Sequence, residues 1–430
     1  MKSRIRWLGS GTWAVMDQGL FATSNFVLSV LLARLLAPQE YGAFTVAYVL
    51  FWVSSSLHTA LLTEPMMVFG PGKYRDQLSE YLGIVLCGHS AYTVLSSSVL
   101  LLASICSVFF GSRDLSLALL GLAIAAPFIL LQWLMRRACY IAFKPYLAAL
   151  AGAQYMVLLL GGIYVLHQLH WLLPFTAFVL MGLGSLFTGI WLALRLRIGW
   201  PSLRDRKLVR EASRSHWTYG RWAAPTQAIG NIPENASYLF LPLWGGLAAS
   251  ASFRAVMNLI LPVLHGITAV SAFLLPSLVR SRGQDEFGHL LRLILLLLLS
   301  GSLAYWLMLG LFHGPLVTWL YGGQYEQYSN LLWLVGLVPL ARTFESVFGA
   351  AVRALERPDH AFWAQTLASA VVLTAGVGLV ISWGVAGALT GYLISQIALA
   401  GALIWLYTKS RKVPLSAAQG EKIGTAGRDQ

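Results

Sequence analysis

Charged residues are scarce in this chain of 430 residues: they make up 11%, and only 17 residues are Asp or Glu. The surface of a water-soluble domain carries about a quarter charged residues, so this composition excludes a soluble globular protein. Cysteine is rare as well. Cys87, Cys106 and Cys139 are an odd, scattered set without the spacing of a disulfide framework or a metal site. The chain is instead 57% hydrophobic, so lipid must solvate most of its side chains.

Long apolar runs separated by short polar breaks fill the sequence. A hydrocarbon core of about 30 Å needs roughly 20 residues of helix, and about twelve runs of that length occur. We therefore predict an all-α polytopic membrane protein with about twelve transmembrane helices in two six-helix bundles. The predicted spans are 13–36, 43–62, 81–110, 115–135, 146–166 and 171–194, then 217–244, 248–279, 290–312, 331–355, 361–381 and 386–407.

The positions of Lys and Arg support this topology, because positive charge in short loops stays on the cytoplasmic side. With the N-terminus inside, nearly all basic residues outside the spans fall in cytoplasmic loops, so both termini are expected in the cytoplasm. The net charge of +13 then reflects topology and does not indicate nucleic-acid binding. A basic island between the two sets of spans comprises Arg195, Arg197, Arg204, Arg206, Lys207, Arg210 and Arg214.

The basic island divides the chain into similar halves. A shift of 209 positions aligns Gly11, Trp13, Gln18 and Phe44 with Gly220, Trp222, Gln227 and Phe253. Two copies with six spans each would enter the membrane in the same orientation, and the binding site would lie between them. The predicted domains are an N-terminal lobe (1–194), a basic cytoplasmic linker (195–216), a C-terminal lobe (217–407) and a cytoplasmic tail (408–430).

Polar residues recur on one face of the seventh span. Gln227, Asn231, Glu234, Asn235 and Tyr238 follow one another at helical spacing, and Pro225 and Pro233 interrupt the same segment. A kinked, polar-faced helix is expected to line a cavity, although bonding to neighbouring helices would also explain it. The first span repeats the pattern with Gln18, Asn25 and Ser29, and Asp17 lies beside them.

Three arginines fall inside predicted spans, where a charge needs a partner or a wet cavity. Arg342 and Glu345 are three residues apart in the tenth span and can pair within the helix. The pair is either structural, or it leaves the guanidinium of Arg342 to meet a phosphate. Arg254 is about two turns from the outer surface, whereas Arg221 is near the cytoplasmic end, where its side chain can reach the headgroups.

The stretch from Gly11 to Phe44 resembles the opening of bacterial polysaccharide flippases of the multidrug/oligosaccharidyl-lipid/polysaccharide (MOP) superfamily. The family pattern of an aliphatic run, Ala-Arg and a Pro-acidic-Tyr-Gly turn is matched by Ala33, Arg34, Pro38, Glu40, Tyr41 and Gly42. A second stretch, from Leu320 to Tyr325, resembles the family's outer loop before the tenth helix.

This resemblance implies two six-helix bundles arranged as a V around a central cavity lined by the first and seventh helices. It also implies a polyprenyl-pyrophosphate-linked oligosaccharide as cargo, moved across the bacterial cytoplasmic (inner) membrane for surface polysaccharide assembly by alternating access of the two lobes. Membrane lipids and polysaccharide assembly proteins are then the expected partners.

We assign hypothetical roles to the polar residues inside the spans. Arg342 and Arg254 would bind the pyrophosphate, and the amides of Gln18, Asn25, Gln227, Asn231 and Asn235 would face the sugars. Asp17, Glu234 and Glu345 are candidates for coupling transport to an ion. No catalytic residue, cofactor or metal is expected.

Two other functions fit the same pattern. A multidrug or organic-cation antiporter of the same superfamily would share the topology and the intramembrane acids. A membrane glycosyltransferase or polysaccharide polymerase would need a substantial outer loop or an acidic metal-binding motif, and the longest predicted outer loop, 313–329, contains one acid, Glu326. We therefore expect a protein that is not an enzyme.

Overall fold

The computed structural model describes residues 2–199, 206–281, 286–355 and 358–411, and in these ranges the chain is helical with no β-strand. This confirms the predicted all-α membrane fold. Apolar side chains as large as Phe109, Leu194 and Trp222 are exposed along the helices. In a protein that crosses the membrane many times, such faces contact lipid, because hydrocarbon is their solvent.

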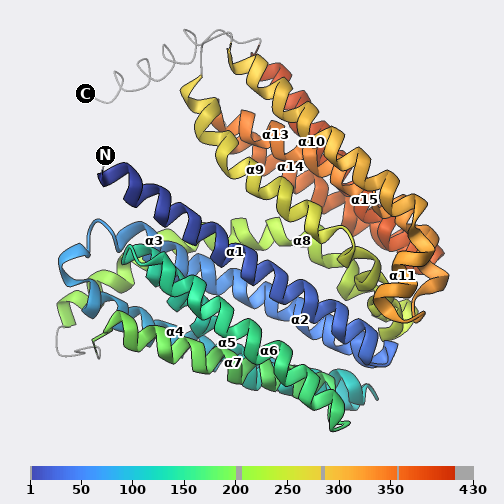
Figure 1. The fold of residues 1–430 in the computed structure, drawn as a ribbon, viewed down its shortest axis with the longest axis horizontal. Coiled ribbons are helices and arrows are strands. Elements are labelled where there is room, and N and C mark those ends of the chain that lie inside the picture. The colour runs from blue at the N-terminus through green and yellow to red at the C-terminus, as the bar shows by residue number, and fades with distance from the viewer. Residues whose placement is uncertain (1, 200–205, 282–285, 356–357, 412–430) are drawn as a thin grey trace. The chain divides into compact units, whose positions relative to one another are not determined.

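The helices fall into two compact units (Figure 1). Unit 1 comprises residues 1–231, 238–258 and 317–326. Its elements are α1 (Lys2–Leu35), α2 (Pro38–His58), the π-helical turn η1 (Thr59–Thr63), α3 (Glu64–Phe69), the short η2 (Arg75–Gln77), α4 (Leu78–Phe109), α5 (Arg113–Ile141), α6 (Pro145–Gln168), α7 (Pro174–Leu196), most of α8 (Arg206–Asn258) and the end of α11 (His313–Tyr321).

Unit 2 comprises residues 232–237, 259–316 and 327–430. Its elements are a short piece of α8, α9 (Leu261–Arg280), α10 (Glu286–Leu311), most of η3 (Glu326–Leu331), α12 (Leu332–Val335), α13 (Val338–Ala354), α14 (Pro358–Val371), the π-helical turn η4 (Val372–Gly376) and α15 (Val377–Arg411). The lobe boundaries predicted from the sequence stay predictions.

Ten helices in the described ranges are long and apolar enough to cross a membrane, and two of them are too long to cross only once. The 53 residues of α8 would extend about 80 Å as one straight helix, against a hydrocarbon core of about 30 Å. The second overlong span is 359–410, which α14, η4 and α15 form together. Each of the two breaks at a glycine with positive φ: α8 at Gly246 (70°) and α15 at Gly384 (53°). Dividing them there gives twelve segments; the limb of α8 after Gly246 is too short to cross alone, and the predicted span 248–279 covers this limb and α9.

The break in α8 lies where the sequence predicted a boundary, between Trp244 and Ala248. The helix also continues unbroken through Pro225 and Pro233, so the only non-helical residue inside it is Gly246. The two prolines, where we expected a kink, therefore do not interrupt the helix. At its other end, α8 begins at Arg206, inside the predicted basic linker.

Helix α5 is the centre of unit 1 and packs against α2, α4 and α7. Small residues let these helices approach closely, as is usual in membrane proteins. An added Cβ at Gly121 would lie 2.7 Å from the carbonyl oxygen of Phe175, and one at Gly182 would lie 2.9 Å from the Cα of Ala125. The tight packing on α5 fixes the positions of its polar residues.

The two stretches that resemble the flippase family meet in unit 1, although about 285 residues separate them. Arg34 donates to the carbonyl oxygen of Trp319 (3.1 Å), and Gln324 donates to the carbonyl oxygen of Arg34 (2.9 Å). A Cβ on Gly42 would lie 1.9 Å from the carbonyl oxygen of Leu247, so only glycine fits there. Both stretches thus hold α1, α2, α8 and α11 together.

In unit 2, α13 packs against α9, α10 and α15 around a core that includes Val347 and Ala351. Helix α15 folds back beside α14 and η4, where a Cβ on Gly391 would lie 2.7 Å from the Cα of Gly376. This packing positions the polar face of α13, which carries Arg342 and Glu345.

Candidate functional site

A cavity of about 240 Å³ in unit 1 is lined by polar residues of α1, α2, η1, α5 and α8. We call it the Asp17 cavity. Three residues to which we assigned roles from the sequence line it: Asp17 and Gln18 of α1, and Gln227 of α8. Its remaining wall is partly aromatic, with Trp52 and Trp133.

Asp17 is fully buried and accepts hydrogen bonds from two side chains of α5. Arg136 donates from Nε (3.0 Å) and from Nη2 (2.7 Å) to Oδ1, and the hydroxyl of Tyr140 donates to Oδ2 (2.6 Å). The guanidinium carbon of Arg136 lies 4.4 Å from the centre of the Phe21 ring. This paired, hydrogen-bonded arrangement compensates the cost of burying both charges.

The sequence interpretation missed Arg136 as a partner of Asp17. It ended the fourth span at Met135 and assigned Arg136 to a cytoplasmic loop, but α5 continues to Ile141 and Arg136 is buried. The sequence did indicate that Asp17 has a basic partner, because an acid at membrane depth needs a cation. The nearest candidates were the two arginines at the end of that span, and only the structure shows which of them is the partner.

Two further pairs border the Asp17 cavity. Gln227 donates to the carboxylate of Glu64 (3.0 Å) at the start of α3. His58, which lines the cavity, shares a hydrogen bond of 3.0 Å with His89 of α4. The two histidines are 31 residues apart on different helices, and nothing in the sequence indicates that they pair.

Arg254 lies in a second polar cluster of unit 1, on the limb of α8 that follows Gly246. Its guanidinium lies 6.0 Å from the ring centre of Tyr48 and 5.8 Å from that of Tyr238, and its Nε donates a long hydrogen bond (3.4 Å) to the hydroxyl of Ser29. Within the described ranges, no carboxylate is within ion-pair distance of Arg254. Aromatic faces and hydroxyls therefore hold this cation and leave its charge uncompensated.

The polar face of α1 connects the two clusters. Gln18 lines the Asp17 cavity; two turns further along, Asn25 accepts a hydrogen bond from the hydroxyl of Tyr48 (3.0 Å). One turn beyond, Ser29 contacts Arg254 and donates to Oδ1 of Asn258 (3.0 Å). The line from Gln18 to Ser29 covers about 16 Å of helix, roughly half of a hydrocarbon core.

Unit 2 contains the other charged residues to which we assigned roles, Arg342, Glu345 and Glu234. Nη1 of Arg342 lies 3.2 Å from the carboxylate of Glu234 and 3.5 Å from that of Glu345. The pairing of Arg342 with Glu345 was predicted from their spacing and is confirmed. Glu234, on the short piece of α8 that belongs to this unit, adds a second acid. This cluster therefore has one more negative than positive charge.

The last two predicted residues, Asn231 and Asn235, are half-buried and one turn apart on α8. Asn231 belongs to unit 1, and its side chain donates to the carbonyl oxygen of Gln227 (2.6 Å) in its own helix. Asn235 belongs to unit 2, on the same short piece of α8 as Glu234.

No protein-family model matches this sequence, and no curated protein matches it significantly. Solved structures do match over nearly the whole chain.

A multidrug resistance MATE family transporter of the MOP superfamily, solved facing inward, aligns with a TM-score of 0.76 at 15% identity and covers 93% of this chain and 99% of its own. The lipid II flippase MurJ, in an inward closed conformation, aligns with a TM-score of 0.73 at 13% identity, covering 94% of this chain and 88% of its own. A MOP superfamily transporter from Pyrococcus furiosus aligns with a TM-score of 0.63 at 15% identity and covers 94% and 95%. The chain thus has the fold of the MOP superfamily transporters.

Proposed function

We propose that this chain is a flippase that carries a polyprenyl-pyrophosphate-linked oligosaccharide across the bacterial inner membrane for surface polysaccharide assembly. The headgroup of such a lipid cannot cross hydrocarbon unaided, whereas its tail need never leave the bilayer. A polar path beside the bilayer serves this cargo, and alternating access of two lobes would expose the path to each side in turn. The fold shared with MurJ, a lipid II flippase, supports a lipid-linked substrate.

Arg254 is the observation that carries this proposal. It is a cation among aromatic rings and hydroxyls, at one end of the polar line along α1. A guanidinium without a carboxylate partner attracts a diphosphate, which it can bind with two parallel hydrogen bonds. The amides of Gln18, Asn25, Gln227, Asn231 and Asn235 are proposed sugar contacts. Arg342 is proposed as the second pyrophosphate residue, although two acids already flank it.

Replacing Arg254 by Gln should abolish surface polysaccharide in cells that depend on this chain, with protein abundance unchanged. Arg342→Ala should do the same if that side chain also contacts the headgroup. Arg221→Gln is the matched control, because Arg221 is exposed and lies over the ring of Trp222, so its loss should have no effect. Normal polysaccharide in the Arg254→Gln strain would rule out its assignment to the headgroup.

We further propose that Asp17, Glu234 or Glu345 couples transport to protons. Each carboxylate pairs with an arginine, and a proton would break that pair and change the charge of its cluster. Transport by the wild type should therefore depend on pH, and replacement of the coupling acid by Asn or Gln should remove this dependence. Transport that is indifferent to pH, before and after all three replacements, would eliminate coupling to protons.

A multidrug or organic-cation antiporter is the second candidate, and the Asp17 cavity is the observation that favours it. A carboxylate close to Trp52 and Trp133 is a suitable surface for an organic cation, and a MATE family transporter shares the fold. Pairing with Arg136 weakens this attraction. A deletion strain that becomes sensitive to cationic drugs and keeps its surface polysaccharide would favour the antiporter.

A further inference from the structure

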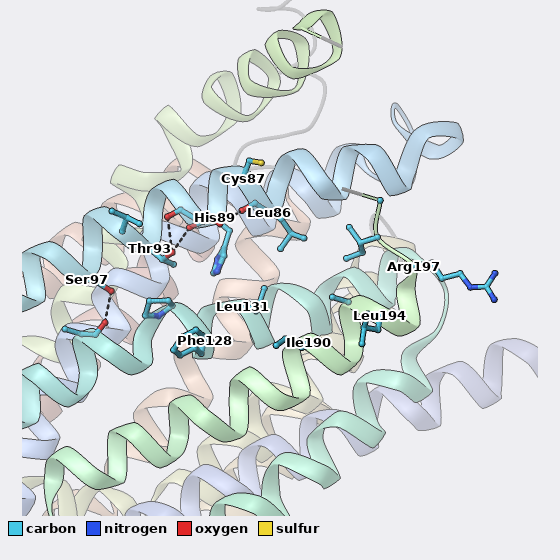
Figure 2. A pocket seen from close by; sticks show the side chains of 17 residues that line it. Leu86, Cys87, His89, Thr93, Ser97, Phe128, Leu131, Ile190, Leu194 and Arg197 are labelled. Atoms are coloured by element: carbon cyan, nitrogen blue, oxygen red, sulfur yellow. Dashed lines mark hydrogen bonds between the residues drawn. The ribbon is translucent and has the colours of Figure 1, made fainter. Parts of the chain in front are cut away.

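A second, larger cavity in unit 1 is a groove of about 830 Å³ between α4 and α7, with α5 as its floor (Figure 2). Leu86 on α4, Phe128 and Leu131 on α5, and Ile190 and Leu194 on α7 line it. All three helices are candidate membrane spans, so the groove faces lipid. It is separate from the Asp17 cavity and contains none of the residues proposed to bind the headgroup.

The hydroxyl and imidazole groups along this groove already have partners within the protein. Thr93 donates to the carbonyl oxygen of His89 (2.9 Å), and His89 is paired with His58. Ser97 donates to the carbonyl oxygen of Ala123 (2.8 Å), which has lost its usual helical donor because Pro127 is four residues later. Since these hydroxyl and imidazole groups are already bonded, the walls favour a hydrocarbon chain over water or a sugar.

The end of the groove at the cytoplasmic end of α7 is built differently. Arg197 ends α7 in a left-handed conformation (φ 52°), and the segment is pinned to the first turn of α4. Ser79 donates to the carbonyl oxygen of Arg197 (3.0 Å) and accepts from the backbone N–H of Gly199 (2.7 Å). These bonds close that end of the groove and hold a basic residue there.

The side chain of Arg197 is exposed and extends away from the floor of the groove, as Figure 2 shows. In the described part of the chain no carboxylate is within ion-pair distance of it. By the distribution of basic residues this end lies in the cytoplasm, where the leaflet is rich in anionic lipids. An apolar slot that ends in a cation is complementary to a lipid with a negatively charged headgroup, and the anionic phospholipids of the surrounding leaflet are the most abundant such lipids.

We propose that this groove is a binding site for an anionic membrane phospholipid, with one acyl chain between α4 and α7 and its phosphate on Arg197. The site would select phosphatidylglycerol over a zwitterionic lipid through the charge of Arg197. It would hold the acyl chain through Leu131 and the apolar residues of both walls.

The full-length protein in nanodiscs of equal parts phosphatidylglycerol and phosphatidylcholine tests this. Either lipid carries a photoreactive acyl chain, and mass spectrometry locates the cross-links. We expect cross-links from phosphatidylglycerol on the groove peptides that contain Leu86, Leu131 and Leu194. Arg197→Gln should weaken the preference for phosphatidylglycerol about fivefold, as expected for about 1 kcal/mol per basic residue at an anionic surface.

Arg195→Gln is the matched control: it removes the same charge two residues away, from a side chain that lies over the ring of Trp191 and does not line the groove. It should leave the preference intact. Ile190→Trp should fill the groove and remove the cross-links without a change of charge, with size-exclusion chromatography to confirm folding. Equal effects of Arg195→Gln and Arg197→Gln, or no cross-links in the groove, would overturn the proposal. So would displacement of phosphatidylglycerol by polyprenyl phosphate at a lower concentration, because the groove would then serve the cargo's tail.

Discussion

At the scale of single residues, the chain separates charges that are compensated from charges that are not. Asp17 and Arg136 neutralise each other in a buried pair, and Arg342 lies between two acids. Arg254 has rings and hydroxyls around it instead. Since an uncompensated charge at membrane depth is costly, it is the one most in need of a functional explanation.

The pair of Asp17 and Arg136 gives a prediction about stability. Asp17→Asn removes the carboxylate and leaves the guanidinium of Arg136 buried without a counter-ion, so the free energy of unfolding should fall by about 3–5 kcal/mol. The double variant Asp17→Asn with Arg136→Gln removes both charges and should be more stable than the single variant. Thermal unfolding in detergent measures this cycle. A double variant that is less stable than Asp17→Asn alone would show that the two residues do not act as a pair.

Sequence alone predicted part of this picture. The spacing of three residues on one helix was enough to pair Arg342 with Glu345, because helical geometry places such side chains together. It was not enough to pair Asp17 with Arg136, which are 119 residues apart and meet only in the folded unit 1. The hydrogen bond between His58 and His89 could not be predicted for the same reason.

At the scale of helices, hydropathy predicted which segments cross the membrane more accurately than it predicted where each helix ends. The α4 helix was predicted to within a few residues, since apolar runs and helix length are both set by the bilayer. The end of α5 was missed by six residues because an arginine normally marks the membrane surface. A boundary between spans was predicted between Trp244 and Ala248, where the helix breaks at Gly246, whereas Pro225 and Pro233 do not interrupt the helix, which continues through both.

The bond from Ser97 to Ala123 gives a prediction about how α4 is held on α5. Ser97→Ala should lower the free energy of unfolding by about 1 kcal/mol, because it leaves a carbonyl oxygen freed by Pro127 without a donor. Thr93→Ala is the control, since Thr93 donates within its own helix and its loss should matter less. Chemical denaturation in mild detergent compares the two. Equal losses of stability would show that the hydrogen bond from Ser97 to the carbonyl oxygen freed by Pro127 contributes no more than the bond of Thr93 within its own helix.

At the scale of the whole molecule, the fold is that of the MOP superfamily transporters, and the two sequence stretches that first suggested this proved to be architectural. Within them, Arg34, Gly42 and Gln324 connect helices of unit 1, and these residues are not assigned to the cargo. The first stretch also contains Gln18 and Asn25, which are proposed to contact the sugars. The duplication of two six-span halves stays a prediction, as do the individual roles of the cargo-binding residues.

The most direct test is translocation by the purified protein in liposomes. A fluorescent polyprenyl-pyrophosphate-linked oligosaccharide is placed in both leaflets, and a membrane-impermeant enzyme or quencher reports how much of it reaches the outside. We expect the wild type and Arg221→Gln to move the lipid to the accessible leaflet, and Arg254→Gln to be at the level of empty liposomes. Transport by Arg254→Gln at the wild-type rate, or none by the wild type while it exchanges an organic cation, would contradict a flippase that binds its anionic headgroup through Arg254.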